Sequence, residues 1–92
     1  MKTVHKFYLI GNPGYWDFHL GGEQPSVVHV GLDPKRELCV WVEIDTDAPG
    51  RTHRIVMHGT GHAVQAGCNH IGSVVHPPYV WHFYSPTLRK AP

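Results

Sequence analysis

Residues 38–44, LCVWVEI, alternate strictly between two kinds of side chain. Leucine, valine and isoleucine occupy the even-numbered positions, and Cys39, Trp41 and Glu43 occupy the odd ones. Because successive side chains of a β-strand point to opposite faces, this segment would bury one aliphatic face. We therefore expect a central strand here, with Trp41 covered by another element.

The same period of two continues on both sides of this segment. The other expected strands are Val4–Ile10, Tyr15–Leu20, Ser26–Leu32, Arg51–His58, His70–Val75 and Tyr79–Tyr84. Ten glycines and eight prolines recur between these runs, as in Gly11-Asn12-Pro13-Gly14, and no run keeps helical spacing for three turns. The sequence therefore predicts an all-β fold, a small antiparallel sandwich or barrel of about six to seven short strands.

Strict alternation also assigns the faces of the third expected strand. One face would carry Val28, Val30 and Leu32. The opposite face would carry Val27 and His29.

The length of the chain sets its domain organisation. Its 92 residues, 41% of them hydrophobic, suffice for one core and are too few for two. We expect a single β domain over residues 1–84. Residues 85–92 show no strand pattern and are expected to form a loose C-terminal tail.

Composition argues against several kinds of partner. Charged residues make up 16% of the chain and the formal net charge is +1. This composition does not predict the clustered basic surface that binds duplex nucleic acid. Met1–Lys6 lacks the apolar core of a signal peptide, and no apolar run reaches the roughly 18–20 residues that span a bilayer. We therefore expect no membrane partner, a cytoplasmic location and two free cysteines.

The most distinctive local motif is Gly59-Thr60-Gly61-His62, directly after an expected strand. Two glycines let backbone N–H groups converge on an anion, and the threonine and histidine would add side-chain donors. Arg54 shares a strand face with His58 and would offer a bidentate contact to phosphate or carboxylate. The predicted ligand-binding residues are Arg54, His58, Gly59, Thr60, Gly61 and His62. The alternative is a glycine-rich turn whose residues satisfy their own backbone.

No metal, cofactor or catalytic residue is predicted. The sequence places His58, His62, Cys68 and His70 within a short segment, but without a recognised zinc-ligand spacing. A phosphoesterase built on two His-x-Thr/Ser dyads would need a second copy of His58-Gly59-Thr60. Neither cysteine lies in a motif that marks a nucleophile. The predicted site therefore binds without catalysing a reaction.

The last expected strand is nearly all aromatic. Alternation places Tyr79, Trp81 and Phe83 in the core and Val80, His82 and Tyr84 on the other face. We predict that His82 and Tyr84 form an interaction surface, because both side chains combine apolar area with a polar tip. A sheet that is apolar on both faces would favour a homodimer or a bound ligand.

Several short motifs also follow one another in a fixed order. They are His5-Lys6, Cys39-Val40-Trp41, Arg51-Thr52-His53-Arg54-Ile55, Gly59-Thr60-Gly61-His62, Ile71-Gly72 and Val80-Trp81-His82-Phe83. In their order and spacing the chain resembles a family of short uncharacterised proteins carried by tailed phages and bacterial prophages. His53 and Ala63 depart from that family, which tends to have an aromatic residue and a proline there. The resemblance implies a phage-type genomic context and a β fold, and it supplies no mechanism.

These observations lead to a functional prediction. We expect a non-enzymatic phage accessory protein that binds stoichiometrically and counters a host antiviral defence by sequestering a small anionic, nucleotide-like ligand. One alternative is a protein–protein inhibitor of a host defence complex, whose partner would be a host protein. Another is a small phosphoesterase that uses His58 and His62.

Overall fold

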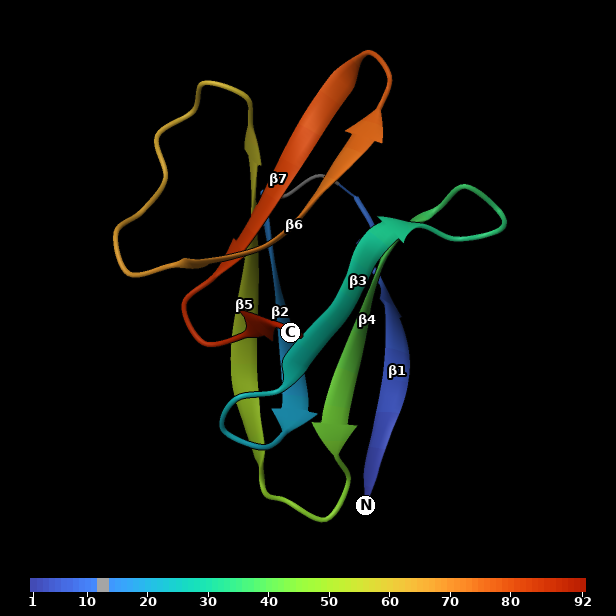
Figure 1. The fold of residues 1–92 in the computed structure, drawn as a ribbon, viewed down its shortest axis with the longest axis vertical. Helices are drawn as coiled ribbons and strands as arrows, with labels where there is room; N and C mark the ends of the chain where they lie inside the picture. Colours follow the sequence, from blue (N-terminus) through green and yellow to red (C-terminus); the bar gives the residue numbers. More distant parts are fainter. Residues whose placement is uncertain (12–13) are drawn as a thin grey trace.

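The computed structural model describes residues 1–11 and 14–92 of the chain. In this part the chain forms eight β-strands and no helix, and the strands pack as two sheets (Figure 1). The strands are β1 (Lys2–Tyr8), β2 (Tyr15–Gly21), β3 (Ser26–Leu32), β4 (Leu38–Asp45), β5 (Gly50–Gly59), β6 (Asn69–His76), β7 (Tyr79–Ser85) and β8 (Arg89–Lys90). The predicted all-β sandwich is confirmed. Two residues of the expected turn at 11–14, Asn12 and Pro13, lie outside the described residues.

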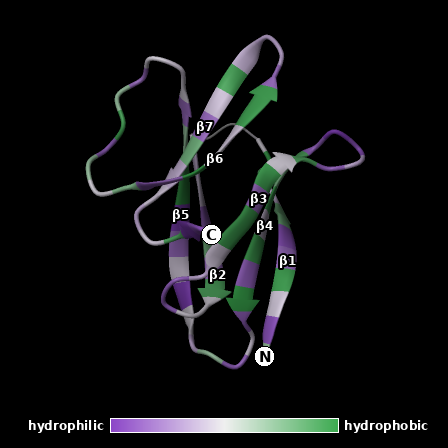
Figure 2. Cartoon of the chain, viewed as in Figure 1, coloured by the Kyte–Doolittle hydropathy of each residue, from purple (hydrophilic) through white to green (hydrophobic). Residues whose placement is uncertain are grey.

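The central position predicted for residues 38–44 is also correct. The first sheet has the order β1-β4-β3-β8 and the second has the order β2-β5-β7-β6, so β4 lies between two neighbours. Val40 and Val42 are buried on its inner face. On its outer face, the Trp41 ring lies against His29 of β3, with 5.4 Å between ring centroids. Figure 2 shows hydrophobic and hydrophilic residues alternating along β4.

Side chains from both sheets meet in one core. Its largest fully buried apolar members are Phe83, Leu20, Ile55, Ile71 and Leu88. The two sheets approach closely where β3 faces β6, because a Cβ atom added at Gly72 would lie 3.0 Å from Cβ of Val30. The absence of a side chain at Gly72 therefore lets β6 pack directly on β3.

The face assignment of β3 needs a correction. Val27 and Val30 are both buried, whereas Val28 is 48% exposed. In the β3–β4 ladder Val27 lies opposite Val42 and His29 lies opposite Trp41, which leaves Val28 as an extra residue. This β-bulge shifts the alternation by one position, so the strict two-residue pattern assigns Val28 to the wrong face.

The C-terminal segment is not a loose tail, so this expectation was wrong. Leu88 is fully buried, and its carbonyl accepts a hydrogen bond of 3.1 Å from Asn69 Nδ2. Its N–H donates to Oγ of the buried Ser85 at 2.9 Å. Strand β8 then pairs in parallel with the start of β3. A single leucine among polar residues gives no periodic signal, which explains why the sequence pattern missed it.

The aromatic strand β7 is less buried than predicted at its beginning. Phe83 is fully buried and Trp81 is half-buried, but Tyr79 is 59% exposed, so its expected place in the core is wrong. Strand β5 pairs with β7 only as far as Gly59, which lies opposite Trp81. Tyr79 therefore projects beyond the end of β5.

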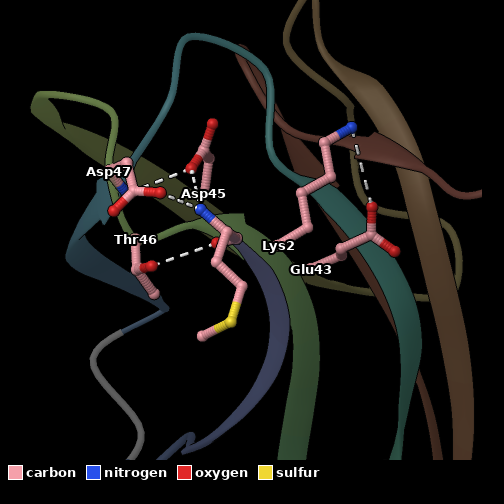
Figure 3. A network of polar contacts seen from close by, with 6 residues as sticks. Lys2, Glu43, Asp45, Thr46 and Asp47 are labelled. Atoms are coloured by element: carbon pink, nitrogen blue, oxygen red, sulfur yellow. Dashed lines mark hydrogen bonds and ion pairs between the residues drawn. The ribbon is translucent and has the colours of Figure 1, made fainter.

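Met1 is hydrogen-bonded to the end of β4 and to the turn between β4 and β5 (Figure 3). The α-ammonium group of Met1 donates to Asp45 Oδ1 at 3.1 Å and to Asp47 Oδ2. The Met1 carbonyl accepts hydrogen bonds from the N–H and the hydroxyl of Thr46, at 2.9 and 3.0 Å. The hydrogen bonds to Asp47 and Asp45 raise the pKa of the α-ammonium group. This network fixes the start of β1 beside the end of β4.

A buried carboxylate organises the loop between β3 and β4. Asp33 Oδ1 accepts the backbone N–H groups of Lys35 and Glu37, both at 2.9 Å, and Oδ2 accepts Lys6 Nζ at 3.2 Å. The Asp33 side chain is 1% exposed, so these three donors replace its contacts with water. The N–H of Glu37 makes the largest contribution to lowering the pKa of Asp33.

Replacing Asp33 by asparagine is expected to lower the unfolding temperature at neutral pH. Because the pKa of Asp33 is lower in the folded chain than in the unfolded one, its carboxylate stabilises the fold above the unfolded value of about 3.9. That contribution is lost as the pH falls through the folded value. Thermal unfolding followed by circular dichroism should show the difference from wild type shrinking below about pH 4, while Glu37→Gln, at an exposed neighbouring residue, serves as the control. A difference independent of pH would contradict this role of the charge.

Candidate functional site

The predicted Gly59–His62 motif forms a tight turn that uses its own polar groups. The N–H of His62 donates to the carbonyl of Gly59 at 3.2 Å, and the N–H of Gly59 donates to Nδ1 of His62 at 3.1 Å. Gly61 has a φ of +88°, a left-handed conformation that favours glycine. Two N–H groups are thus hydrogen-bonded within the turn. This agrees with the alternative interpretation, in which the residues of a glycine-rich turn satisfy their own backbone.

The hydrogen bond inside this turn also fixes the state of the His62 ring. Nδ1 accepts a proton from a backbone N–H, so it carries no proton of its own. In the neutral ring the single proton is therefore on Nε2. The His62 side chain is exposed and presents an N–H donor from this atom.

Arg54 is not brought together with the glycine turn. The β2–β5 register places Arg54 directly opposite Asp17, and Nε and Nη2 donate to its two carboxylate oxygens at 2.8 and 2.9 Å. Its guanidinium also lies 4.2 Å from the ring centroid of Tyr15. The hydrogen bonds raise the pKa of Arg54 and lower that of Asp17. His58 lies four residues further along β5, roughly 13 Å away at the usual rise of a strand.

A chain of hydrogen-bonded side chains on the outer face of the second sheet connects the turn after β5 with β7 and β6. Nε2 of His82 lies 2.9 Å from Oγ1 of Thr60, and Nδ1 of His82 lies 2.8 Å from Oγ of Ser73. The same Ser73 oxygen lies 2.9 Å from Nε2 of His70. We call Thr60, His82, Ser73 and His70 the imidazole network. Both nitrogens of the His82 ring are hydrogen-bonded within this network.

Each hydroxyl group has a single proton to donate, and this limits the directions of the hydrogen bonds in the imidazole network. The single hydroxyl proton of Ser73 serves only one of its two ring neighbours, so at least one ring donates an N–H to Ser73. When His82 carries protons on both ring nitrogens, it donates to Ser73 and to Thr60. The Thr60 oxygen then accepts from the ring, so its hydroxyl proton points away from His82 and is free to bind a ligand.

Tyr84 extends this polar face. Its ring lies between His58 and His70, with centroid distances of 5.8 and 5.2 Å and edge-on geometry in both pairs. His82 and Tyr84 lie on the outer face, where the sequence pattern placed them. The predicted interaction surface is therefore adjacent to the predicted ligand-binding residues Thr60 and His58.

Sequence reasoning missed His70 and Ser73 as members of the site. They are three residues apart, so regular alternation would place them on opposite faces of β6. The β6–β7 register shifts between His70 and Gly72, because Ile71 is an extra residue in the ladder. This bulge turns both polar side chains outward. Only the pairing of Ser73 with His82 across the sheet would have revealed the contact.

A hollow of about 180 Å³ lies beside the imidazole network. The glycine turn forms one wall, and His58, His82 and Tyr84 form the other. Of the six predicted ligand-binding residues, the fold brings five together around this hollow and leaves out Arg54. The volume suits a small group such as phosphate rather than a whole drug-sized ligand, which usually occupies roughly 300–1,000 Å³.

The distribution of charge favours an anion at this hollow. All seven acidic residues lie within residues 17–47, whereas residues 48–92 hold four lysines and arginines, six histidines and no acid. The formal charge is therefore −3 for residues 1–47 and +4 for residues 48–92, before any histidine is protonated. Every residue that lines the hollow belongs to the half without acids.

Other kinds of site find little support in the described residues. In residues 1–11 and 14–92, no three His, Cys, Asp or Glu side chains lie together in a way that would hold a metal ion. His53 is buried, with Nδ1 2.7 Å from Oγ1 of Thr87 and Nε2 3.1 Å from the carbonyl of Gly22. Burial raises the pKa of the Cys39 thiol. None of the described residues belongs to a helix that is long and apolar enough to cross a membrane.

The fold and this site define a small all-β sandwich protein with histidines and hydroxyl groups joined on the outer face of one sheet. A family model matches residues 1–92, and the chain belongs to this family, DUF7352, a domain of unknown function. Searches of the curated proteins and of the solved structures found no match.

Proposed function

We propose that this chain is a non-enzymatic binding protein that captures a small anionic, nucleotide-like ligand in the hollow beside the imidazole network. The observation that carries this proposal is the combination of N–H and O–H donors with a complete lack of carboxylates around the hollow. Anions are bound by such donors and repelled by nearby acids.

The geometry supports a specific set of contacts. His62 carries its ring proton on Nε2, and Thr60 offers a hydroxyl proton when its oxygen accepts the Nε2–H of His82. The His82 ring is already oriented by two hydrogen bonds, which lowers the entropy that binding would cost. Arg54 is not part of this set because Asp17 already binds its guanidinium.

The biological setting of the proposal comes from the resemblance to phage-borne proteins. A phage accessory protein that counters a host antiviral defence would remove an anionic signalling molecule by binding it stoichiometrically. One bound ligand per chain suffices for that role, and turnover is not needed. Such a protein would act in the host cytoplasm.

A second candidate function is inhibition of a host defence protein by direct contact. The hairpin formed by β6 and β7 exposes three apolar side chains, with Val75 67% and Tyr79 59% exposed and Val80 next to them. Exposed apolar patches of this kind often mark protein interfaces. Such an inhibitor would retain a host protein on purification, and His82 variants would leave that contact intact.

Titration calorimetry with pyrophosphate tests anion capture. We expect one molecule bound per chain. We expect His82→Ala to weaken binding about 10- to 100-fold, because Thr60 loses the ring nitrogen that directs its hydroxyl proton toward the anion, and one hydrogen bond to a charged group contributes about 1.5–3 kcal/mol. Thr60→Val removes a hydroxyl with little change of shape and should also weaken binding. The matched control is His5→Ala, an exposed histidine on the other sheet, which should bind like wild type.

Two results would contradict the proposal. If pyrophosphate binding is undetectable, or is equally strong in wild type and His82→Ala, the hollow is not an anion site. If one equivalent of chain hydrolyses many equivalents of pyrophosphate or of a cyclic nucleotide, the protein is an enzyme. The phosphoesterase alternative would then replace the binding proposal.

A further inference from the structure

A second, larger hollow adjoins the first one. Its volume is about 430 Å³, and it shares Gly59, Thr60 and His62 with the smaller hollow beside the imidazole network. Its remaining wall is formed by residues 78–81, where the hairpin between β6 and β7 begins its return. A ligand that touches the glycine turn therefore has two neighbouring spaces of different size.

The wall of the larger hollow is aromatic. The rings of Tyr79 and Trp81 lie 5.2 Å apart with an interplanar angle of 39°, and Pro78 continues the same wall. Trp81 is half-buried and paired with Gly59 across the sheet, so it is held in place, while Tyr79 remains largely exposed. Aromatic side chains in this arrangement offer a surface on which a flat ring can stack.

The two hollows differ in chemistry as well as in size. Both hollows are lined by Gly59, Thr60 and His62. The smaller one adds His58, Gly61, Val64, His82 and Tyr84, whereas the larger one adds Pro78, Tyr79, Val80 and Trp81. Only the larger one falls within the usual volume range of small-molecule sites, roughly 300–1,000 Å³. His62 lines both hollows, and its ring proton is on Nε2 because Nδ1 accepts the Gly59 N–H.

We infer that the ligand carries a flat heteroaromatic ring in addition to its anionic group, as a nucleoside monophosphate does. The ring lies in the larger hollow against Tyr79 and Trp81, and the phosphate lies in the smaller hollow beside His82. This inference rests on the proposed function, because the phosphate contact is the one proposed there. It adds the residues that recognise the rest of the molecule.

Comparison of ligands with and without a ring tests the inference. Calorimetric titrations use ribose 5-phosphate and the four common nucleoside monophosphates as probes. At least one monophosphate should bind roughly tenfold or more tightly than ribose 5-phosphate, since stacking a base on an aromatic side chain typically has that effect. Tyr79→Ala should remove this advantage and leave the affinity for ribose 5-phosphate unchanged.

Variants separate this inference from the proposed function. His82→Ala should weaken every phosphate-bearing probe, with or without a ring. Tyr79→Phe should keep the advantage of the nucleotides, because it retains the ring. Tyr8→Ala, at an exposed tyrosine on the other sheet, should behave like wild type. Circular dichroism confirms that each variant is folded.

The possible outcomes are distinct. If all monophosphates and ribose 5-phosphate bind equally and His82→Ala weakens them all, the anion site stands and the inference about the ring is overturned. The same holds if a nucleotide advantage persists in Tyr79→Ala. If none of the probes binds, both the proposed function and the inference fail.

Discussion

Replacing Phe83 by alanine is expected to destabilise the fold by about 3–5 kcal/mol. Phe83 is the largest fully buried side chain, and its ring centroid lies 6.4 Å from that of Trp16. It belongs to β7, which has a hydrogen-bonded neighbour on each side, so the backbone has little freedom to collapse into the space left behind. A domain of ordinary stability holds only about 5–15 kcal/mol in total, so this single change removes a large share.

Urea unfolding followed by tryptophan fluorescence measures this effect. Tyr79→Ala is the matched control, because it removes an aromatic ring from the same strand at an exposed position and should cost far less. If Phe83→Ala is unfolded in buffer, Phe83→Leu provides the smaller step. A loss below about 1 kcal/mol for Phe83→Ala would contradict the placement of this ring at the centre of the core.

Replacing Leu88 by alanine is expected to cost about 2–5 kcal/mol, although only four residues follow it in the chain. Leu88 is fully buried and is held by hydrogen bonds from Asn69 and to Ser85. Its side chain therefore belongs to the core that β3 and β6 enclose. A leucine in a loose tail would contribute almost nothing.

Lys90, an exposed residue of β8, provides the control for this prediction. Lys90→Ala changes an exposed side chain two residues further on and should stay within about 0.5 kcal/mol of wild type. Both variants are compared by urea unfolding under the same conditions. Equal stability of Leu88→Ala and Lys90→Ala would mean that residues 86–92 do not pack on the sandwich.

Most of the fold could be predicted because strands leave a two-residue rhythm in the sequence. Seven of the eight strands lie where the alternation placed them, and β2, with Trp16 and Leu20 facing inward, follows the pattern throughout. The exceptions have local physical causes. The bulge at Val28 shifts the rhythm by one residue, and β8 is only two residues long. Neither leaves a periodic signal.

The candidate site was harder to predict because contacts between strands form it. The glycine turn and His58 are contiguous in sequence, so they were found together. Asp17 lies 37 residues from Arg54, and only the β2–β5 register shows that the two are partnered. Likewise, Ser73 meets His82 because of a bulge in β6. Sequence spacing contains none of these pairings.

The position of the acidic residues links the fold to the proposed function. Strands β5, β6 and β7 all lie in the half of the chain without acids, and they are hydrogen-bonded neighbours in one sheet. The three strands around His82 therefore carry no carboxylate, while Asp17 on β2, at the edge of the same sheet, is bound to Arg54. The lack of carboxylates around His82 follows from the strand order, because β5, β7 and β6 are neighbours in the second sheet.

The central claim is that the outer face of β5, β7 and β6 around His82 is a binding surface for an anion. Two-dimensional NMR spectra of the backbone and imidazole groups, recorded while pyrophosphate is added, test it most directly. The account predicts that the signals of Thr60, His62 and His82 move together and saturate at one equivalent, while those of His5 and His29 on the other sheet stay in place. Unchanged signals around His82, or the largest changes on the first sheet, would contradict it.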